Sequence, residues 1–69
     1  MTQTERVLDY MKENGSITQM EAMTQLGIYR LGARIWDLKK SGANVKKEMA
    51  SEKTRYGTTT HFARYRLEN

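Results

Sequence analysis

Hydrophobic residues recur with helical spacing in the N-terminal part of the chain. One stripe predicts a helix from about residue 3 to 14, and its members are Val7, Leu8 and Met11, with Tyr10 at the edge. Thr2 and Glu5 have the spacing of a capping box, in which each side chain accepts a hydrogen bond from the other residue's backbone N–H. The helix is expected to end at Asn14-Gly15, because glycine adopts the left-handed conformation of a helix end.

A second, shorter helix is predicted after a brief extended link at Ser16-Ile17. Thr18 and Glu21 form another capping box, and Ile17 can pack against Ala22 as a hydrophobic staple. Gly27 ends this helix, since glycine turns the chain sharply without steric cost. The inner face of the helix is expected to consist of Ala22, Met23 and Leu26.

A third helix is predicted from about Arg30 to Ser41, and Gly42 closes it. Tyr29 stands at its N-cap position, where Ser, Thr, Asp or Asn is usual. Ile28 is expected to be buried between the helices. The hydrophobic stripe of this third helix is Leu31, Ile35 and Leu38.

The C-terminal part alternates with a period of two, which predicts two strands. Arg55-Tyr56-Gly57 fits a three-residue hairpin loop with glycine in the left-handed position. The alternation and the loop agree on one register. That register pairs Val45 with Leu67, Lys47 with Tyr65, and Met49 with Ala63.

Three helices followed by a two-stranded hairpin predict an α+β fold, a winged helix, in one domain of residues 1–69. The expected core gathers the hydrophobic residues of all these elements. Its members are Val7, Leu8, Met11, Ala22, Leu26, Ile28, Leu31, Ile35, Leu38, Val45, Tyr65 and Leu67.

Composition narrows the classes of function. The chain has 69 residues and no cysteine, so a disulfide or a thiolate metal site is excluded, and neither a metal nor another cofactor is expected. His61 is the only histidine, and no set of nucleophile, base and orienting group can be assembled, so we expect no enzyme. The N-terminus is no signal peptide and no apolar run has membrane-span length, which predicts a soluble, cytoplasmic protein. Twelve Lys and Arg against eight Asp and Glu suit an anionic partner.

The order of these motifs resembles the winged helix-turn-helix family, and in particular the very small helix-turn-helix proteins of bacteriophages and mobile elements. The resemblance implies binding to double-stranded DNA, with the third helix in the major groove. Counted from Gly27, the spacing to Leu31 and Ile35 is shorter than in the repressor type, which indicates a tight turn. The resemblance rests on Ser16-Ile17-Thr18, Glu21-Ala22, Gly27-Ile28, Arg30-Leu31, Ala33-Arg34-Ile35, Asp37-Leu38-Lys39, Gly42, Arg55-Tyr56-Gly57 and Ala63-Arg64-Tyr65.

Helical geometry sorts the third helix into faces. Arg30 lies in the first turn, which reaches base edges in helix-turn-helix proteins, so we expect it to contact DNA. Arg34 either contacts DNA or pairs with Asp37 one turn further on. We expect Trp36 to pack beneath the hairpin, and the alternative is stacking on a partner. The side opposite the hydrophobic stripe presents Tyr29, Ala33, Trp36 and Lys40.

The hairpin is rich in cationic side chains, and Tyr56 lies at its tip. It is either a wing along the phosphate backbone or an edge protected from aggregation by lysine. Thr18 and Gln19 can meet a phosphate at the start of the second helix. The complete set of predicted DNA contacts is Thr18, Gln19, Tyr29, Arg30, Ala33, Arg34, Lys40, Lys53, Arg55, Tyr56 and Arg64.

Two hypotheses of function follow from the sequence. The first is a DNA-binding regulator, or an accessory DNA-binding factor, of a phage or mobile element. The second is an interaction module that binds a host or phage protein. A single winged helix contacts few phosphates, so dimerisation or tandem sites would help it to bind tightly. No long apolar helix is left over to make a dimer, so the expected state is a monomer or a weak dimer.

Overall fold

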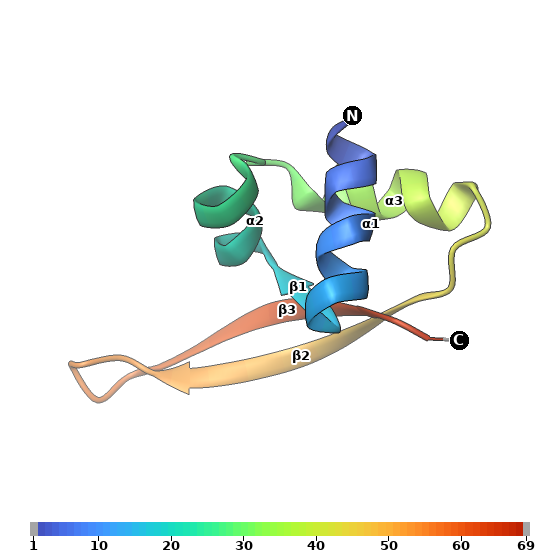
Figure 1. Cartoon of the computed structure of the whole chain (residues 1–69). Helices are drawn as coiled ribbons and strands as arrows, with labels where there is room; N and C mark the ends of the chain where they lie inside the picture. Colours follow the sequence, from blue (N-terminus) through green and yellow to red (C-terminus); the bar gives the residue numbers. More distant parts are fainter. Residues whose placement is uncertain (1, 69) are drawn as a thin grey trace.

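Three helices lie over one face of an antiparallel sheet in the computed structural model, which describes residues 2–68 (Figure 1). The elements in chain order are α1 (Gln3–Asn14), β1 (Ser16–Thr18), α2 (Gln19–Leu26), α3 (Leu31–Lys40), β2 (Val45–Lys53) and β3 (Thr59–Leu67). The α+β winged-helix fold predicted from the pattern is confirmed. The predicted link at Ser16-Ile17 is instead part of strand β1, so the sheet has three strands in the order β1-β3-β2.

The N-terminal ends of α1 and α2 form as the sequence predicts. The Thr2 hydroxyl accepts from the Glu5 N–H at 3.1 Å, and the Glu5 carboxylate accepts from the Thr2 N–H at 3.2 Å. Thr18 and Glu21 make the same reciprocal pair at the start of α2. Both capping boxes are therefore confirmed, and each satisfies backbone donors that a helix leaves open at its start.

Helix α3 begins and ends one residue inside the predicted limits. Leu31 is its first residue and Lys40 its last, and Arg30 takes the N-cap position that was predicted for Tyr29. Arg30 has φ −118° and ψ 65° and gives no side-chain cap. The tight turn after Gly27, which has φ 69°, holds residues 28–30 outside the helix and moves the cap by one residue.

The hairpin has the predicted register, with Val45 opposite Leu67, Lys47 opposite Tyr65 and Met49 opposite Ala63. Its loop closes between Thr54 and Thr58, where the Thr54 N–H donates to the Thr58 carbonyl at 2.8 Å. Gly57 has φ 81°, the left-handed conformation that the three-residue loop requires. The hairpin projects well beyond the helices (Figure 1).

The core lies between the helices and the sheet. Most of the predicted members are buried, whereas Leu8, Leu26, Tyr65 and Leu67 are only half-buried at the margin of this small domain. Ile17 was expected only to pack against Ala22 and was not among the predicted core residues, but it is fully buried. The reason is that β1 pairs it with Tyr65 on the helix-facing side of the sheet. The buried hydrophobic residues are Val7, Met11, Ile17, Ala22, Ile28, Leu31, Ile35, Leu38 and Val45.

The prediction that Trp36 packs beneath the hairpin is wrong, since its side chain is 59% exposed. The hairpin leaves the body past α2, and so it does not cover the outer face of α3 (Figure 1). Among residues 2–68, no helix has the length and apolar character needed to cross a membrane.

Candidate nucleic-acid interface

The outer face of α3 is open to solvent. Leu31, Ile35 and Leu38 are buried on the inner side. On the outer side Trp36 is exposed, and Tyr29 just before the helix is 74% exposed. The Lys40 Nζ atom lies 4.7 Å from the centroid of the Trp36 ring, a cation–π contact one turn along the helix. Ala33, also predicted on this side, is half-buried.

One flank of α3 is occupied by α1. The Thr4 hydroxyl of α1 donates to the Asp37 carboxylate at 3.3 Å. The Arg34 Nε atom lies 3.6 Å from the same carboxylate oxygen, so the ion pair considered for Arg34 is present. A half-exposed pair of this kind is weak, and its main consequence here is to hold Arg34 on the α1 side of the helix.

Gln19 joins the two helices of the helix-turn-helix. Its Nε2 donates to the Ile28 carbonyl at 3.2 Å, and its Oε1 accepts from the Leu31 N–H at 3.1 Å. Leu31 is the first residue of α3, whose N-cap supplies no side-chain bond. Gln19 therefore takes the place of the missing cap and fixes the start of α3. The DNA contact predicted for Gln19 stays a prediction, and the only sequence signal for this structural role was the poor cap at residues 29–30.

We expect Gln19→Ala to destabilise the protein by about 1 kcal/mol, because both the Leu31 N–H and the Ile28 carbonyl lose their partner. Gln25→Ala is the matched control, since Gln25 lies exposed on the same helix. Urea unfolding followed by circular dichroism measures both variants. Equal midpoints for the two variants would show that Gln19 does not support the turn.

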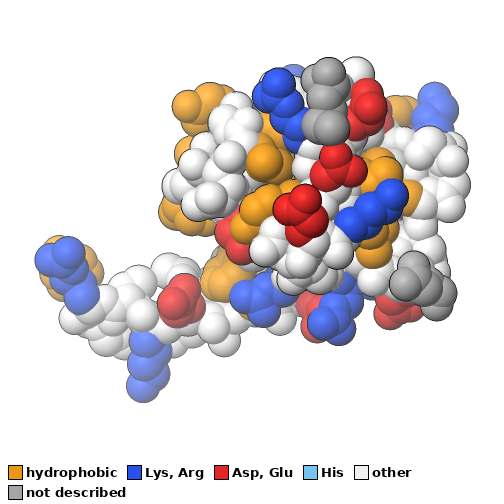
Figure 2. All heavy atoms as spheres, viewed as in Figure 1, with side chains coloured by type: hydrophobic (Ala, Val, Ile, Leu, Met, Phe, Trp, Pro, Cys, Tyr) orange, Lys and Arg blue, Asp and Glu red, His pale blue; other side chains and the backbone are white. Residues whose placement is uncertain are grey.

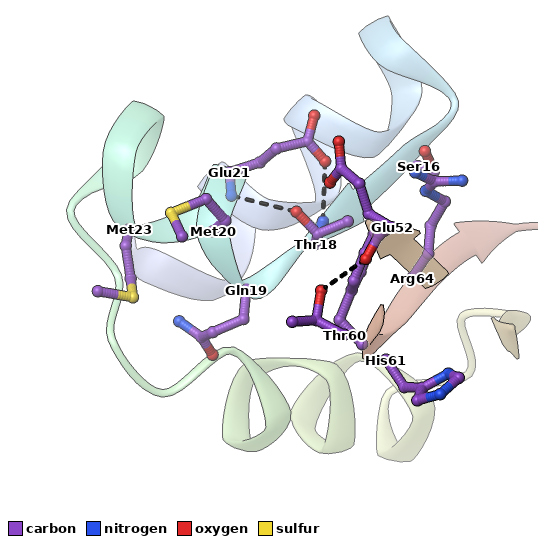
Figure 3. Close-up of a pocket in the computed structure, with 11 residues that line it drawn as sticks. Ser16, Thr18, Gln19, Met20, Glu21, Met23, Glu52, Thr60, His61 and Arg64 are labelled. Atoms are coloured by element: carbon purple, nitrogen blue, oxygen red, sulfur yellow. Dashed lines mark hydrogen bonds between the residues drawn. The ribbon is translucent and has the colours of Figure 1, made fainter. Parts of the chain in front are cut away.

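The start of α2 faces a groove of about 580 Å³ between that helix and the outer part of the hairpin (Figure 3). Thr18 is buried, and its hydroxyl caps the Glu21 N–H at 3.2 Å. The Glu21 carboxylate also accepts from the Tyr10 hydroxyl at 2.9 Å, and burial together with this bond raises the pKa of Tyr10. Because Glu21 and Glu52 line the groove with Arg64 as its one Lys or Arg side chain among residues 2–68, a phosphate deep inside it would meet two carboxylates and one guanidinium. The groove is therefore a poor phosphate site, and the contact predicted for Thr18 stays a prediction.

The two faces of the hairpin differ in charge. The face that continues from Val45 carries Lys47 and Lys53 and no carboxylate in either strand. The opposite face mixes both signs, and there the Arg66 Nε atom lies 3.0 Å from the Glu48 carboxylate. That opposite face consists of Lys46, Glu48, Ala50, Glu52, Thr60, Phe62, Arg64 and Arg66. Of the predicted contacts, Lys53 thus lies on the purely cationic face, and Arg64 lies on the mixed one.

The tip of the hairpin carries an exposed cation and an exposed aromatic ring. Tyr56 is 82% exposed, and the Arg55 guanidinium carbon lies 5.9 Å from the centroid of its ring. Both residues are far from the acidic side chains of α1. The tip is therefore free to approach a polyanion.

Charge is divided unevenly over the molecule. Residues 2–26 hold two Lys or Arg and four Asp or Glu, whereas residues 27–68 hold ten and four. Glu5, Asp9 and Glu13 follow one another at intervals of four along α1. Figure 2 shows acidic side chains with some Lys and Arg over the face of the body formed by α1, and along the projecting hairpin Lys and Arg side chains together with an acidic one. The excess of Lys and Arg over Asp and Glu is therefore carried by the part of the chain that forms α3 and the hairpin.

Within residues 2–68, no three His, Asp or Glu side chains come together in a group that could hold a metal ion. No curated protein matches the chain. The family model described as a winged helix-turn-helix domain matches residues 2–69, which include every helix and strand from Gln3 to Leu67. By fold and by sequence, the chain belongs to the winged helix-turn-helix family.

Proposed function

We propose that this protein binds double-stranded DNA, with α3 in the major groove and the β2–β3 hairpin along the phosphate backbone. The observation that carries the proposal is the coincidence of exposed cations on both of these elements, in a fold whose α1 side is acidic. We assign the base contact to Arg30, which is exposed at the start of α3. The phosphate contacts are assigned to Lys40, Lys53, Arg55 and Arg64.

The role that follows is that of a transcriptional regulator, or of an accessory DNA-binding factor, of a phage or mobile element, acting in the cytoplasm. A domain with so few phosphate contacts binds a single short site weakly. Tandem sites, or a weak dimer on a repeated site, supply the missing affinity. Regulation by such a protein therefore depends on how its sites are spaced.

Lys53→Ala is expected to weaken binding to all duplexes alike and to reduce the salt dependence of binding by about one unit of slope. The matched control is Lys12→Ala, which removes the same charge from α1. Fluorescence anisotropy of labelled duplexes at several salt concentrations measures both variants. If both variants lower the slope equally, the effect comes from net charge, and the hairpin does not contact the backbone.

A further inference from the structure

The middle of the outer face of α3 is apolar, and its one large side chain is Trp36. A tryptophan that is 59% exposed has no packing role in so small a core. Four residues before it stands Gly32, which lies in the helix with no left-handed φ, and open space surrounds the position where a Cβ would be. Glycine inside a helix is less stable than alanine, and at this position neither a left-handed φ nor a crowded neighbour requires it. Apart from the contact of Trp36 with Lys40, no contact within the described chain explains either residue, which points to a partner that approaches this face closely.

The charges around Trp36 suit the major groove. Lys39 and Lys40 lie in the last turn of α3, and Arg30 stands at its other end. Lys40 covers one side of the indole at 4.7 Å, so the ring and its cation form one unit. The two lysines match the phosphates on a wall of the groove, Arg30 contacts a base at the other end of α3, and the apolar middle then faces the base edges on the groove floor.

Only one base edge in the major groove suits an apolar side chain. Adenine, guanine and cytosine present hydrogen-bond donors and acceptors there, whereas thymine adds a methyl group on C5. Gly32 and Ala33 carry no hydrogen-bonding side chain, and Trp36 offers a single N–H donor. The thymine O4 atom beside the methyl group is an acceptor for such a donor, whereas cytosine presents a donor at the same place.

We propose that Trp36 reads the C5 methyl group of a thymine in the major groove, so that a T·A pair is specified beneath the centre of α3. This inference rests on the proposed DNA binding. It makes Trp36 a specificity-determining residue, which adds an apolar contact to the base contact assigned to Arg30.

The test uses a duplex that the wild-type protein selects from a random-sequence library. Each thymine is replaced in turn by uracil, which removes only the methyl group. We expect one position at which this replacement weakens binding about three- to five-fold, the effect of one buried methyl group. Trp36→Ala should bind the thymine and uracil duplexes equally. Met20→Ala is the matched control, because Met20 is another exposed apolar side chain but lies on α2. This variant should keep the wild-type preference for the thymine duplex over the uracil duplex.

The same methyl group also occurs in 5-methylcytosine. A duplex with 5-methylcytosine paired to guanine at the sensitive position therefore distinguishes recognition of thymine from recognition of 5-methylcytosine. We expect it to bind more weakly than the thymine duplex, because its amino group opposes the indole N–H, and tighter binding would overturn the assignment to thymine. Equal affinity for the thymine and uracil duplexes at every position would overturn the inference and leave the proposed function standing. A preference for thymine over uracil that survives in Trp36→Ala would do the same. Failure to bind any duplex would overturn both. Circular dichroism confirms that each variant is folded.

Discussion

Leu31→Ala is expected to remove about 2–5 kcal/mol of stability, the usual range for truncating a buried leucine. Leu31 is 1% exposed, and it packs in the cluster that joins α1, α3 and the sheet. A domain of this length has a total stability of roughly 3–10 kcal/mol, so this loss is a large fraction of the total and the melting temperature should fall sharply. Thermal unfolding followed by circular dichroism measures the change.

Leu8→Ala is the control for this variant, because it removes the same atoms from a half-buried position on α1. Its loss of stability should be clearly smaller, since less apolar surface returns to water. A Leu31→Ala protein that melts at the temperature of the parent would mean that α3 does not turn this face to the core.

Arg30→Ala is expected to reduce the discrimination between DNA sites by about 1–3 kcal/mol at the base pair that Arg30 reads. The side chain is exposed at the start of α3, and within residues 2–68 it has neither an ion pair nor a capping bond. Its guanidinium is therefore free to bind guanine through two parallel hydrogen bonds. Competition between the selected duplex and its single-base variants measures the loss.

The charge-matched variant Arg30→Lys separates reading from attraction. Lysine keeps the positive charge but lacks the planar pair of donors, so it should retain non-specific affinity and still lose discrimination. Equal weakening of all sequences by Arg30→Ala would place this residue on the phosphates, and base reading would then have to come from elsewhere on α3.

Most of the fold could be predicted because its signals are local. Two capping boxes lie within four residues each, and the hairpin register follows from a three-residue loop and a period of two. Strand β1 escaped prediction because three residues are too short to show a period, and its pairing of Ile17 with Tyr65 joins distant parts of the chain.

The candidate site was harder to predict than the fold. The exposure of Trp36 depends on the direction in which the hairpin leaves the body, and no local pattern encodes that direction. Gln19 bonds to a residue 12 positions away, so its support of α3 appears only in three dimensions. Arg34 and Asp37 are one turn apart, so the sequence alone could predict their ion pair as the alternative to a DNA contact of Arg34.

The most direct test of DNA binding through α3 and the hairpin is a titration of labelled duplexes from around the protein's own gene at about 50 mM and about 200 mM salt. Four phosphate contacts predict that the affinity falls on the order of a hundredfold between the two conditions. They also predict that one fragment binds more tightly than the others at both. A folded, monodisperse protein that binds no duplex at the lower salt concentration would contradict DNA binding altogether.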